Sequence, residues 1–221
     1  MVSTTIDFSD YRVRRITSGE GKRFIRARHY SRSCHNGPSP CYGLFVTDDR
    51  LPSGESLIGV LAFATPCSEN VRASVFGVDY KDHVTELHRL VIEDFYDGAK
   101  TPKNTESWFI SRCLKMLKRD KPKIWAVLSF SDSTEGHTGV IYKATNAKFC
   151  GMTSKATFYL DQEMRLRHPR QNGVNITTDE AITRGWCPVK RLSKYRYLWL
   201  LPDSRGHKKQ LERLSKFHDP R

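Results

Sequence analysis

The sequence lacks a long apolar run and a secretory leader. None of its 221 residues lies in an uninterrupted apolar stretch near the roughly eighteen residues that a membrane span requires. The N-terminus, MVSTTIDFSDYRVRR, has no basic region followed by an apolar core and a small-residue cleavage site. We therefore expect a soluble globular protein that avoids membranes and stays in the cytoplasm.

Paired cysteines are also missing. The six cysteines are widely spaced, and no two of them form a C-x-x-C pair. The nearest approach to a zinc motif is Cys34, His35 and Cys41, whose spacing exceeds the usual two to four residues. We expect reduced thiols and no zinc site.

Acidic residues are scarce relative to basic ones. The chain has 24 Asp and Glu against 37 Lys and Arg, a formal net charge of +13. Residues 33–99 carry 4 basic and 10 acidic groups, whereas residues 161–221 carry 14 basic and 7 acidic groups. Although basic runs are often only solvated surface, an excess of this size favours a polyanionic partner such as nucleic acid.

Hydrophobic periodicity predicts alternating helices and strands. Helices are expected over 20–30, 104–120 and 137–146, the last with Val140, Ile141 and Ala144 facing inward. The expected strands cover residues 41–48, 55–65, 83–94, 123–132, 147–154, 156–162 and 195–202. This order predicts an α/β fold, a mixed central sheet with crossover helices.

The length suits a single domain overall. Residues 1–160 would form the catalytic core, and residues 161–221 would add the remaining strands, a basic arm over 162–190 and a tail. The arm is weakly patterned, and the tail from 206 could be a short basic helix or disordered.

The run from Thr85 to Gly151 resembles the core of the GNAT acyltransferases, in which a helix N-terminus holds a pyrophosphate. The glycine pair of that turn is missing, because the segment reads TPKNTES. Lys103, Asn104, Thr105 and Ser107 could still supply hydrogen-bond donors to a cofactor. Acyl-CoA therefore stays open as a cofactor.

Four segments together resemble the phage Mom family, whose members convert adenine in phage DNA to its carbamoylmethyl derivative and so hide the genome from restriction enzymes. The segments are HYSR at 29–32, ELHRLVIED at 86–94, NTESWFISRCLKMLKR at 104–119 and SFSDSTEGHTGVIYKATNAKFCG at 129–151. The most specific pattern is SDxxxGHxGxIYxAxxxxxxG, from Ser131 to Gly151. The resemblance implies a bacteriophage transferase on a GNAT-like fold that acts against host restriction.

The resemblance also implies the site residues. His29, Tyr30, Asp132 and Tyr142 would be catalytic and would bind an iron ion. Imidazole, carboxylate and phenolate groups are donors that suit iron better than zinc. Taken singly, Tyr142 could be a core residue, Asp132 could cap a turn, and the other two could simply end a helix.

Three further histidines are candidates for acid–base chemistry. His137 lies in the most specific pattern, where it could equally form the first turn of a helix. His83 and His88, near Glu86 on one predicted strand, could act as a general base in an acyltransferase.

Chemistry on adenine in double-stranded DNA requires the base to be flipped out and stacked on an aromatic ring. The possible platforms are Tyr30, Tyr42, Phe45 and Trp108. The backbone would be held by two basic sets. These sets are Arg12, Arg14, Arg15, Arg23, Arg26, Arg28 and Arg32, and Arg165, Arg167, Arg170, Lys190, Arg191, Lys194 and Arg196.

Two other functions compete with DNA adenine modification. An acyl-CoA-dependent N-acetyltransferase would act on a small or protein amine and bind CoA tightly. A non-enzymatic DNA-binding protein would bind DNA in a salt-dependent way and form no product. No motif in the sequence indicates which small molecule donates the transferred group.

Overall fold

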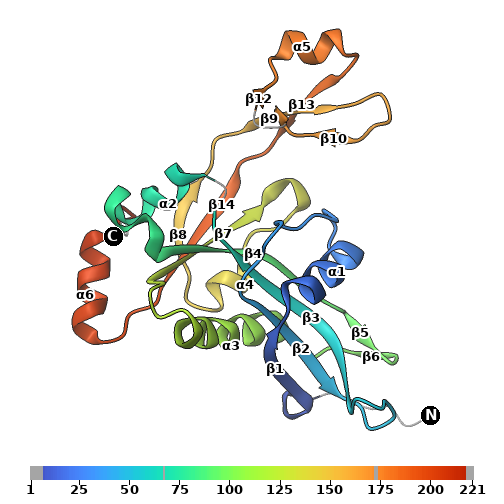
Figure 1. The fold of residues 1–221 in the computed structure, drawn as a ribbon, viewed down its shortest axis with the longest axis vertical. Coiled ribbons are helices and arrows are strands. Elements are labelled where there is room, and N and C mark those ends of the chain that lie inside the picture. Colours follow the sequence, from blue (N-terminus) through green and yellow to red (C-terminus); the bar gives the residue numbers. More distant parts are fainter. Residues whose placement is uncertain (1–6, 67, 172–173, 218–221) are drawn as a thin grey trace. The chain divides into compact units, whose positions relative to one another are not determined.

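The computed structural model describes residues 7–66, 68–171 and 174–217, and its chain divides into two compact units (Figure 1). The first unit comprises residues 1–129, 141–148 and 198–221. The second comprises residues 130–140 and 149–197. No helix in the described part of the chain is long and apolar enough to cross a membrane.

A seven-stranded mixed sheet organises the fold. Its first four strands are antiparallel neighbours, and β4 then pairs in parallel with β7, with Val84 opposite Ala126. The strands, in spatial order, are β1 (Tyr11–Ile16), β2 (Cys41–Thr47), β3 (Glu55–Ala64), β4 (Val84–Ile92), β7 (Ala126–Asp132), β14 (Lys194–Leu200) and β8 (Lys148–Met152). The predicted α/β class and the predicted hairpin over 41–65 are confirmed.

Two helices of the first unit follow directly from their sequences. Helix α1 (Ser18–Arg28) begins in a capping box, in which Thr17 and Glu20 satisfy each other's backbone N–H. Helix α3 (Thr105–Asp120) buries a continuous apolar face. The buried residues of that face include Phe109, Ile110, Cys113, Leu114 and Leu117, so the predicted amphipathic helix is confirmed.

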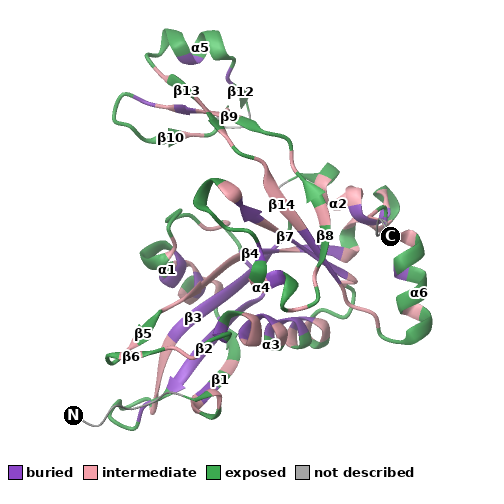
Figure 2. Ribbon diagram, turned by 180° about the vertical axis from the view of Figure 1, so that it is seen from behind, coloured by how far each residue is buried: buried purple, intermediate pink, exposed green. Residues whose placement is uncertain are grey.

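The buried residues concentrate on β2 and β3, which lie in the purple region of Figure 2. Helix α1 packs against them through Phe24 and Ile25, which join Cys41 and Val60 in one apolar cluster. Six elements of this unit were not predicted. They are the 3-10 helices η1 (Phe8–Asp10) and η2 (Val78–His83), the strand β1, the helix α2 (Glu69–Phe76) and the short strands β5 (Phe95–Tyr96) and β6 (Ala99–Lys100).

The predicted helix over 137–146 is largely wrong. Only α4 (Val140–Lys143) is helical, Val140 is 66% exposed, Ala144 is exposed, and Tyr142 is the buried residue. Gly136 and Gly139 have φ values of 74° and 73°, so the preceding segment turns instead of extending the helix. A Cβ at Gly139 would lie 2.2 Å from the ring of Tyr197, so only glycine fits there.

The predicted basic arm is a folded part of the second unit. Strand β9 (Ala156–Leu160) lies between β10 (Leu166–Arg167) and β13 (Cys187–Arg191) in an antiparallel sheet. Its core contains Tyr159, Ile176, Ala181 and Trp186. The other elements of this segment are β11 (Arg170–Gln171), β12 (Val174–Asn175) and α5 (Thr178–Thr183).

The C-terminal tail forms the helix α6 (Arg205–Leu214). Of the two states expected for this tail, a short helix or disorder, the helix is confirmed. Leu211 is its buried residue, and Arg213 lies in its last turn. Residues 218–221 of the predicted tail lie outside the described residues.

Candidate active site

Tyr142 is the buried centre of a polar cluster in the first unit. It is 9% exposed, and its hydroxyl hydrogen-bonds the side chain of Ser129 on β7. Its ring stands edge-on to Trp199, with centroids 5.3 Å apart. Burial raises the pKa of Tyr142, the hydrogen bond from the Ser129 side chain opposes that rise, and the negative charge of Glu86 adds to it. The phenol therefore keeps its proton at neutral pH.

His29 and Tyr30 lie where α1 ends. His29 is the C-cap residue, and its ring centroid lies 4.2 Å from that of Tyr30. The Ser31 backbone N–H donates to His29 Nδ1 at 3.1 Å, which fixes the orientation of the imidazole. Tyr30 is 54% exposed, so it offers an accessible aromatic surface at the end of α1.

Glu86 and His88 occupy the same face of β4. The Glu86 carboxylate lies 3.6 Å from Nδ1 of His88, and their side chains are 19% and 13% exposed. The backbone N–H of His35 donates to Nε2 of His88 at 3.1 Å. Because Nε2 accepts that bond, the ring carries its proton on Nδ1, the nitrogen that faces Glu86. With Nε2 engaged and Nδ1 protonated, His88 has no nitrogen that can accept a proton, so Glu86 is the better placed proton acceptor.

His83 is not part of this face. It belongs to η2, outside β4, and its Nδ1 lies 2.7 Å from the carbonyl oxygen of Lys123. Its ring stacks on Trp125 at 3.5 Å. These contacts give His83 a structural role. Of the two histidines predicted to lie on one strand, His88 lies on β4 and His83 does not.

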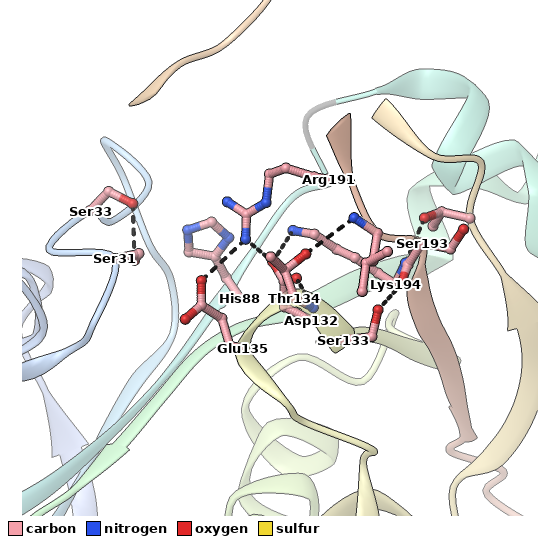
Figure 3. Close-up of polar contacts among 12 residues, drawn as sticks. Ser31, Ser33, His88, Asp132, Ser133, Thr134, Glu135, Arg191, Ser193 and Lys194 are labelled. Carbon is pink, nitrogen blue, oxygen red and sulfur yellow. Dashed lines mark hydrogen bonds and ion pairs between the residues drawn. The ribbon is translucent and has the colours of Figure 1, made fainter. Parts of the chain in front are cut away.

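Asp132 lies at the end of β7 and belongs to the second unit (Figure 3). Its Oδ2 accepts from Arg191 at 2.8 Å and lies 3.3 Å from Nζ of Lys194. Its Oδ1 accepts from the Thr134 N–H at 3.1 Å. Burial raises the pKa of Asp132, but Lys194 and Arg191 outweigh burial and the net shift is downward. His137 follows in an exposed turn, where its backbone N–H donates to the Asp132 carbonyl.

These donors do not fit an iron ion as they stand. The Asp132 carboxylate already faces two cations, which would repel a metal cation. The pKa of Tyr142 is raised, which disfavours the phenolate that iron would require. No cluster of three or more His, Cys, Asp or Glu residues suited to a metal occurs in the described ranges.

The predicted cofactor-binding residues lie at the start of α3. The Thr105 hydroxyl donates to the Pro102 carbonyl at 2.7 Å, and the Ser107 hydroxyl donates to the Asn104 carbonyl at 3.0 Å. Lys103 is exposed. A shallow pocket of about 400 Å³ adjoins them on the outer face of α3, and its lining includes Asn104, Ser107, Trp108, Ser111, Arg112 and Lys115.

Two of the four predicted stacking platforms are corrected by the structure. Tyr42 is fully buried, and its hydroxyl donates to Asp120. Phe45 is buried beneath the guanidinium of Arg14 at 3.9 Å. Trp108 is half-buried, stacks on Phe8 and lines the pocket on α3. Tyr30 is the more exposed of the two platforms that remain.

Four of the seven cations in the second predicted basic set pair with carboxylates of the same unit. Arg165 and Arg167 both donate to the buried Asp161, at 3.1 and 2.7 Å. Arg191 and Lys194 pair with Asp132 in the same way. The second unit therefore offers fewer free cations to a polyanion than its composition suggests.

The basic residues of β1 and α1 are less occupied. Arg14 pairs with Glu55, and Arg28 pairs with Glu93. The exposed basic residues of this region that make no ion pair with any residue the structure describes are Arg12, Arg15, Arg23, Arg26 and Arg32. They form the available basic surface of the first unit.

Comparison with known proteins identifies the family. A model of the Mom protein family matches residues 10–218. The methylcarbamoylase Mom of Escherichia phage Mu is 30% identical over 201 residues, which cover 87% of this chain and 76% of the relative. The chain belongs to the Mom protein family. This Mom family member is accordingly a transferase, which removes the alternative of a non-enzymatic DNA-binding protein.

Solved structures resemble the Mom fold at low identity. Arabidopsis thaliana NAA60 in complex with acetyl-CoA matches with a TM-score of 0.50 and 11% identity, over 86% of this chain and 98% of that one. A variant of the spermidine N-acetyltransferase SpeG from Vibrio cholerae matches with a TM-score of 0.47 and 13% identity, over 93% of this chain and 98% of that one. The first of these similarities shows the fold, and the predicted GNAT-like architecture of this Mom protein is confirmed.

Two residues of this Mom protein's candidate site were not singled out from sequence. They are Ser129, which bonds Tyr142, and His35, which bonds His88. Ser129 alternates with apolar residues in the buried strand β7, and a hydroxyl in such a strand must find a partner. That pattern was a usable signal. The bond from His35 to His88 spans 53 positions and had no local signal.

Proposed function

We propose that this protein transfers a carbamoylmethyl group to the exocyclic N6 amine of adenine in double-stranded DNA. The supporting observation is the family match over residues 10–218, together with the naming of the phage Mu relative as a methylcarbamoylase. Modified adenine would protect a phage genome from restriction enzymes in the cytoplasm of the bacterial host. The net charge of +13 agrees with a DNA partner.

The target base has to leave the duplex, because its amine is paired and stacked there. Tyr30 supplies the stacking surface, since this residue is 54% exposed. The adjacent His29 ring accepts a hydrogen bond from the Ser31 backbone N–H, which holds it in place. This arrangement sets the flipped adenine beside the cluster of Tyr142, Ser129 and Glu86.

In the transfer, N6 bonds to the methylene carbon of a small-molecule donor, the bond from that carbon to the donor's leaving group breaks with its electron pair, and N6 then loses a proton. Glu86 accepts that proton, because its carboxylate is partly buried and lies beside the protonated Nδ1 side of His88, 3.6 Å away. Tyr142 keeps its own proton and donates a hydrogen bond to the reacting group. The family resemblance still implies iron, but no step here passes through a metal, because the donors do not fit one.

The DNA backbone is held by the available basic surface of the first unit. Arg12, Arg15, Arg23, Arg26 and Arg32 are exposed on β1, on α1 and just beyond α1. Each phosphate that such a cation neutralises adds about 0.9 to the slope of log affinity against log salt. The grip therefore weakens steeply with ionic strength.

Nucleoside mass analysis tests the proposal. DNA from bacteria that express the full chain is digested and compared with DNA from cells that express Glu86→Gln. We expect carbamoylmethyl-deoxyadenosine with the wild type and a loss of about tenfold or more with the variant. Unmodified deoxyadenosine alone, from cells with confirmed soluble wild-type protein, would contradict the proposal.

An acyl-CoA-dependent N-acetyltransferase is the second candidate, and the pocket on α3 is the observation that favours it. Calorimetry with acetyl-CoA separates the two functions. The acetyltransferase predicts saturable CoA binding that Arg112→Gln weakens, together with acetylation of a small or protein amine. DNA modification without CoA binding excludes it.

A further inference from the structure

Both oxygens of the Asp132 carboxylate are engaged by described residues. Its Oδ2 is shared by Arg191 and Lys194, and its Oδ1 is bonded to the Thr134 N–H. The Asp132 side chain is 6% exposed and that of Arg191 is 17% exposed, and Arg191 also lies 3.3 Å from Glu135. Removing the charge of Asp132 takes from the poorly solvated Arg191 its shorter ion pair, which is unfavourable.

The two cations flank the connection between β13 and β14. Arg191 ends β13, Lys194 begins β14, and only Leu192 and Ser193 lie between them. The Leu192 N–H donates to the Thr134 hydroxyl at 3.2 Å, and the Ser133 hydroxyl donates to the Ser193 carbonyl. The η3 turn (Ser133–Glu135) after Asp132 therefore holds every residue of this connection.

The chain that leads into β9 is held at the same place. The Lys194 N–H donates to the Thr153 hydroxyl at 2.9 Å, and the Thr153 N–H donates to the Lys194 carbonyl at 2.9 Å. Thr153 precedes β9, so both ends of the β9–β13 segment meet near the Asp132 ion pairs. The Arg191 guanidinium also lies over the ring of Phe158 on β9, at 5.6 Å.

We propose that Asp132 is a positioning residue that anchors both ends of the β9–β13 segment through Arg191 and Lys194, instead of binding a metal. The contacts that carry this inference all lie within the second unit. The carboxylate, the two cations and the hydroxyls of Ser133, Thr134 and Thr153 form a network that engages both oxygens of Asp132. Its consequence for activity rests on the proposed function, but the anchoring itself does not.

Hydrogen exchange of the full-length protein tests the anchoring. Peptides covering 190–195 report on the Leu192 and Lys194 amides, whose acceptors are Thr134 and Thr153. We expect Asp132→Asn and Arg191→Gln each to speed exchange there by about tenfold, and the double variant to add little. Asp132→Glu, which keeps the charge, should recover part of the protection.

Asp179→Asn is the matched control. Asp179 is an exposed carboxylate in the first turn of α5 and makes no ion pair with a described residue of the chain. It should leave exchange at 190–195 unchanged. Exchange in Asp132→Asn within twofold of the wild type would overturn the proposal.

Metal content and modified nucleoside separate the remaining outcomes. If Asp132 bound iron, Asp132→Asn would lower the iron content and Arg191→Gln would not; that pattern also overturns the proposal. The anchoring role predicts equal, small effects of both variants on iron content. If the wild type makes no modified adenine, the proposed function fails, and the exchange data still decide the role of Asp132.

Discussion

The two units differ in how far their basic side chains are paired with carboxylates. In the first unit, Tyr30 is exposed and basic residues such as Arg23 and Arg26 make no ion pair with a described residue. In the second unit, buried aspartates bind the nearby cations, as Asp161 binds Arg165 and Arg167. The lesson is that a count of basic residues does not measure the charge available to a ligand.

The largest expected effect distinguishes two buried tyrosines, one in each unit. Tyr142→Phe removes the phenol at the proposed site, and we expect adduct formation to fall by about a hundredfold or more. Tyr197→Phe is the control. The Tyr197 hydroxyl donates to the Thr138 carbonyl at 2.7 Å, a contact that supports the fold of the second unit. The control variant should cost about 1 kcal/mol of stability and leave modification nearly intact. Equal losses in nucleoside analysis would remove the special role of Tyr142.

A smaller effect concerns DNA affinity. The double variant Arg23→Gln/Arg26→Gln should lower the slope of log affinity against log salt by roughly two, because each cation neutralises about one phosphate. Arg165→Gln/Arg167→Gln should change that slope little, since Asp161 already pairs with both side chains. Fluorescence anisotropy with labelled duplex at several salt concentrations measures both slopes. If Arg165→Gln/Arg167→Gln lowered the slope more than Arg23→Gln/Arg26→Gln, the second unit would be the one that binds the DNA backbone.

The smallest effect is on acid stability. Burial raises the pKa of Asp161, but hydrogen bonds from the Arg165 backbone and from the Arg167 and Arg165 side chains lower it overall to about 2. The lowered value stabilises the fold above the ordinary carboxyl pKa, and this contribution disappears as the pH falls through about 2. Hydrogen exchange in 156–167 should therefore accelerate between about pH 4 and pH 2.

Asp161→Asn is the control for this pH dependence. Its amide oxygen can still accept from the backbone N–H groups of Glu163 and Arg165, which now donate at 3.1 and 2.8 Å. The variant should exchange faster at neutral pH and show no step on acidification. A step of unchanged size would assign the acid sensitivity to another group.

Much of the fold was predictable because local patterns carried it. The apolar face of α3 and the apolar run of β7 predicted those elements directly. The segment around α4 was not predictable in the same way, since Gly139 and the ring of Tyr197 decide its path from 58 positions apart. The folded β9–β13 segment was missed because its core is small and its strands are short.

The candidate site shows the same division. The family resemblance implied His29, Tyr30, Asp132 and Tyr142, and whether these four act together stays a prediction. No local pattern indicated that His35 would bind His88 or that Arg191 and Lys194 would pair with the carboxylate of Asp132.

Residue order alone determined the fold class, the family and the excess of positive charge, because periodicity, motif spacing and composition are properties of neighbouring positions. Only the tertiary structure decided which aromatic rings stay exposed, which cations stay unpaired and which imidazole nitrogen carries a proton. Those outcomes depend on contacts between residues distant in the chain, where a single hydrogen bond or a buried carboxylate changes what a side chain can do.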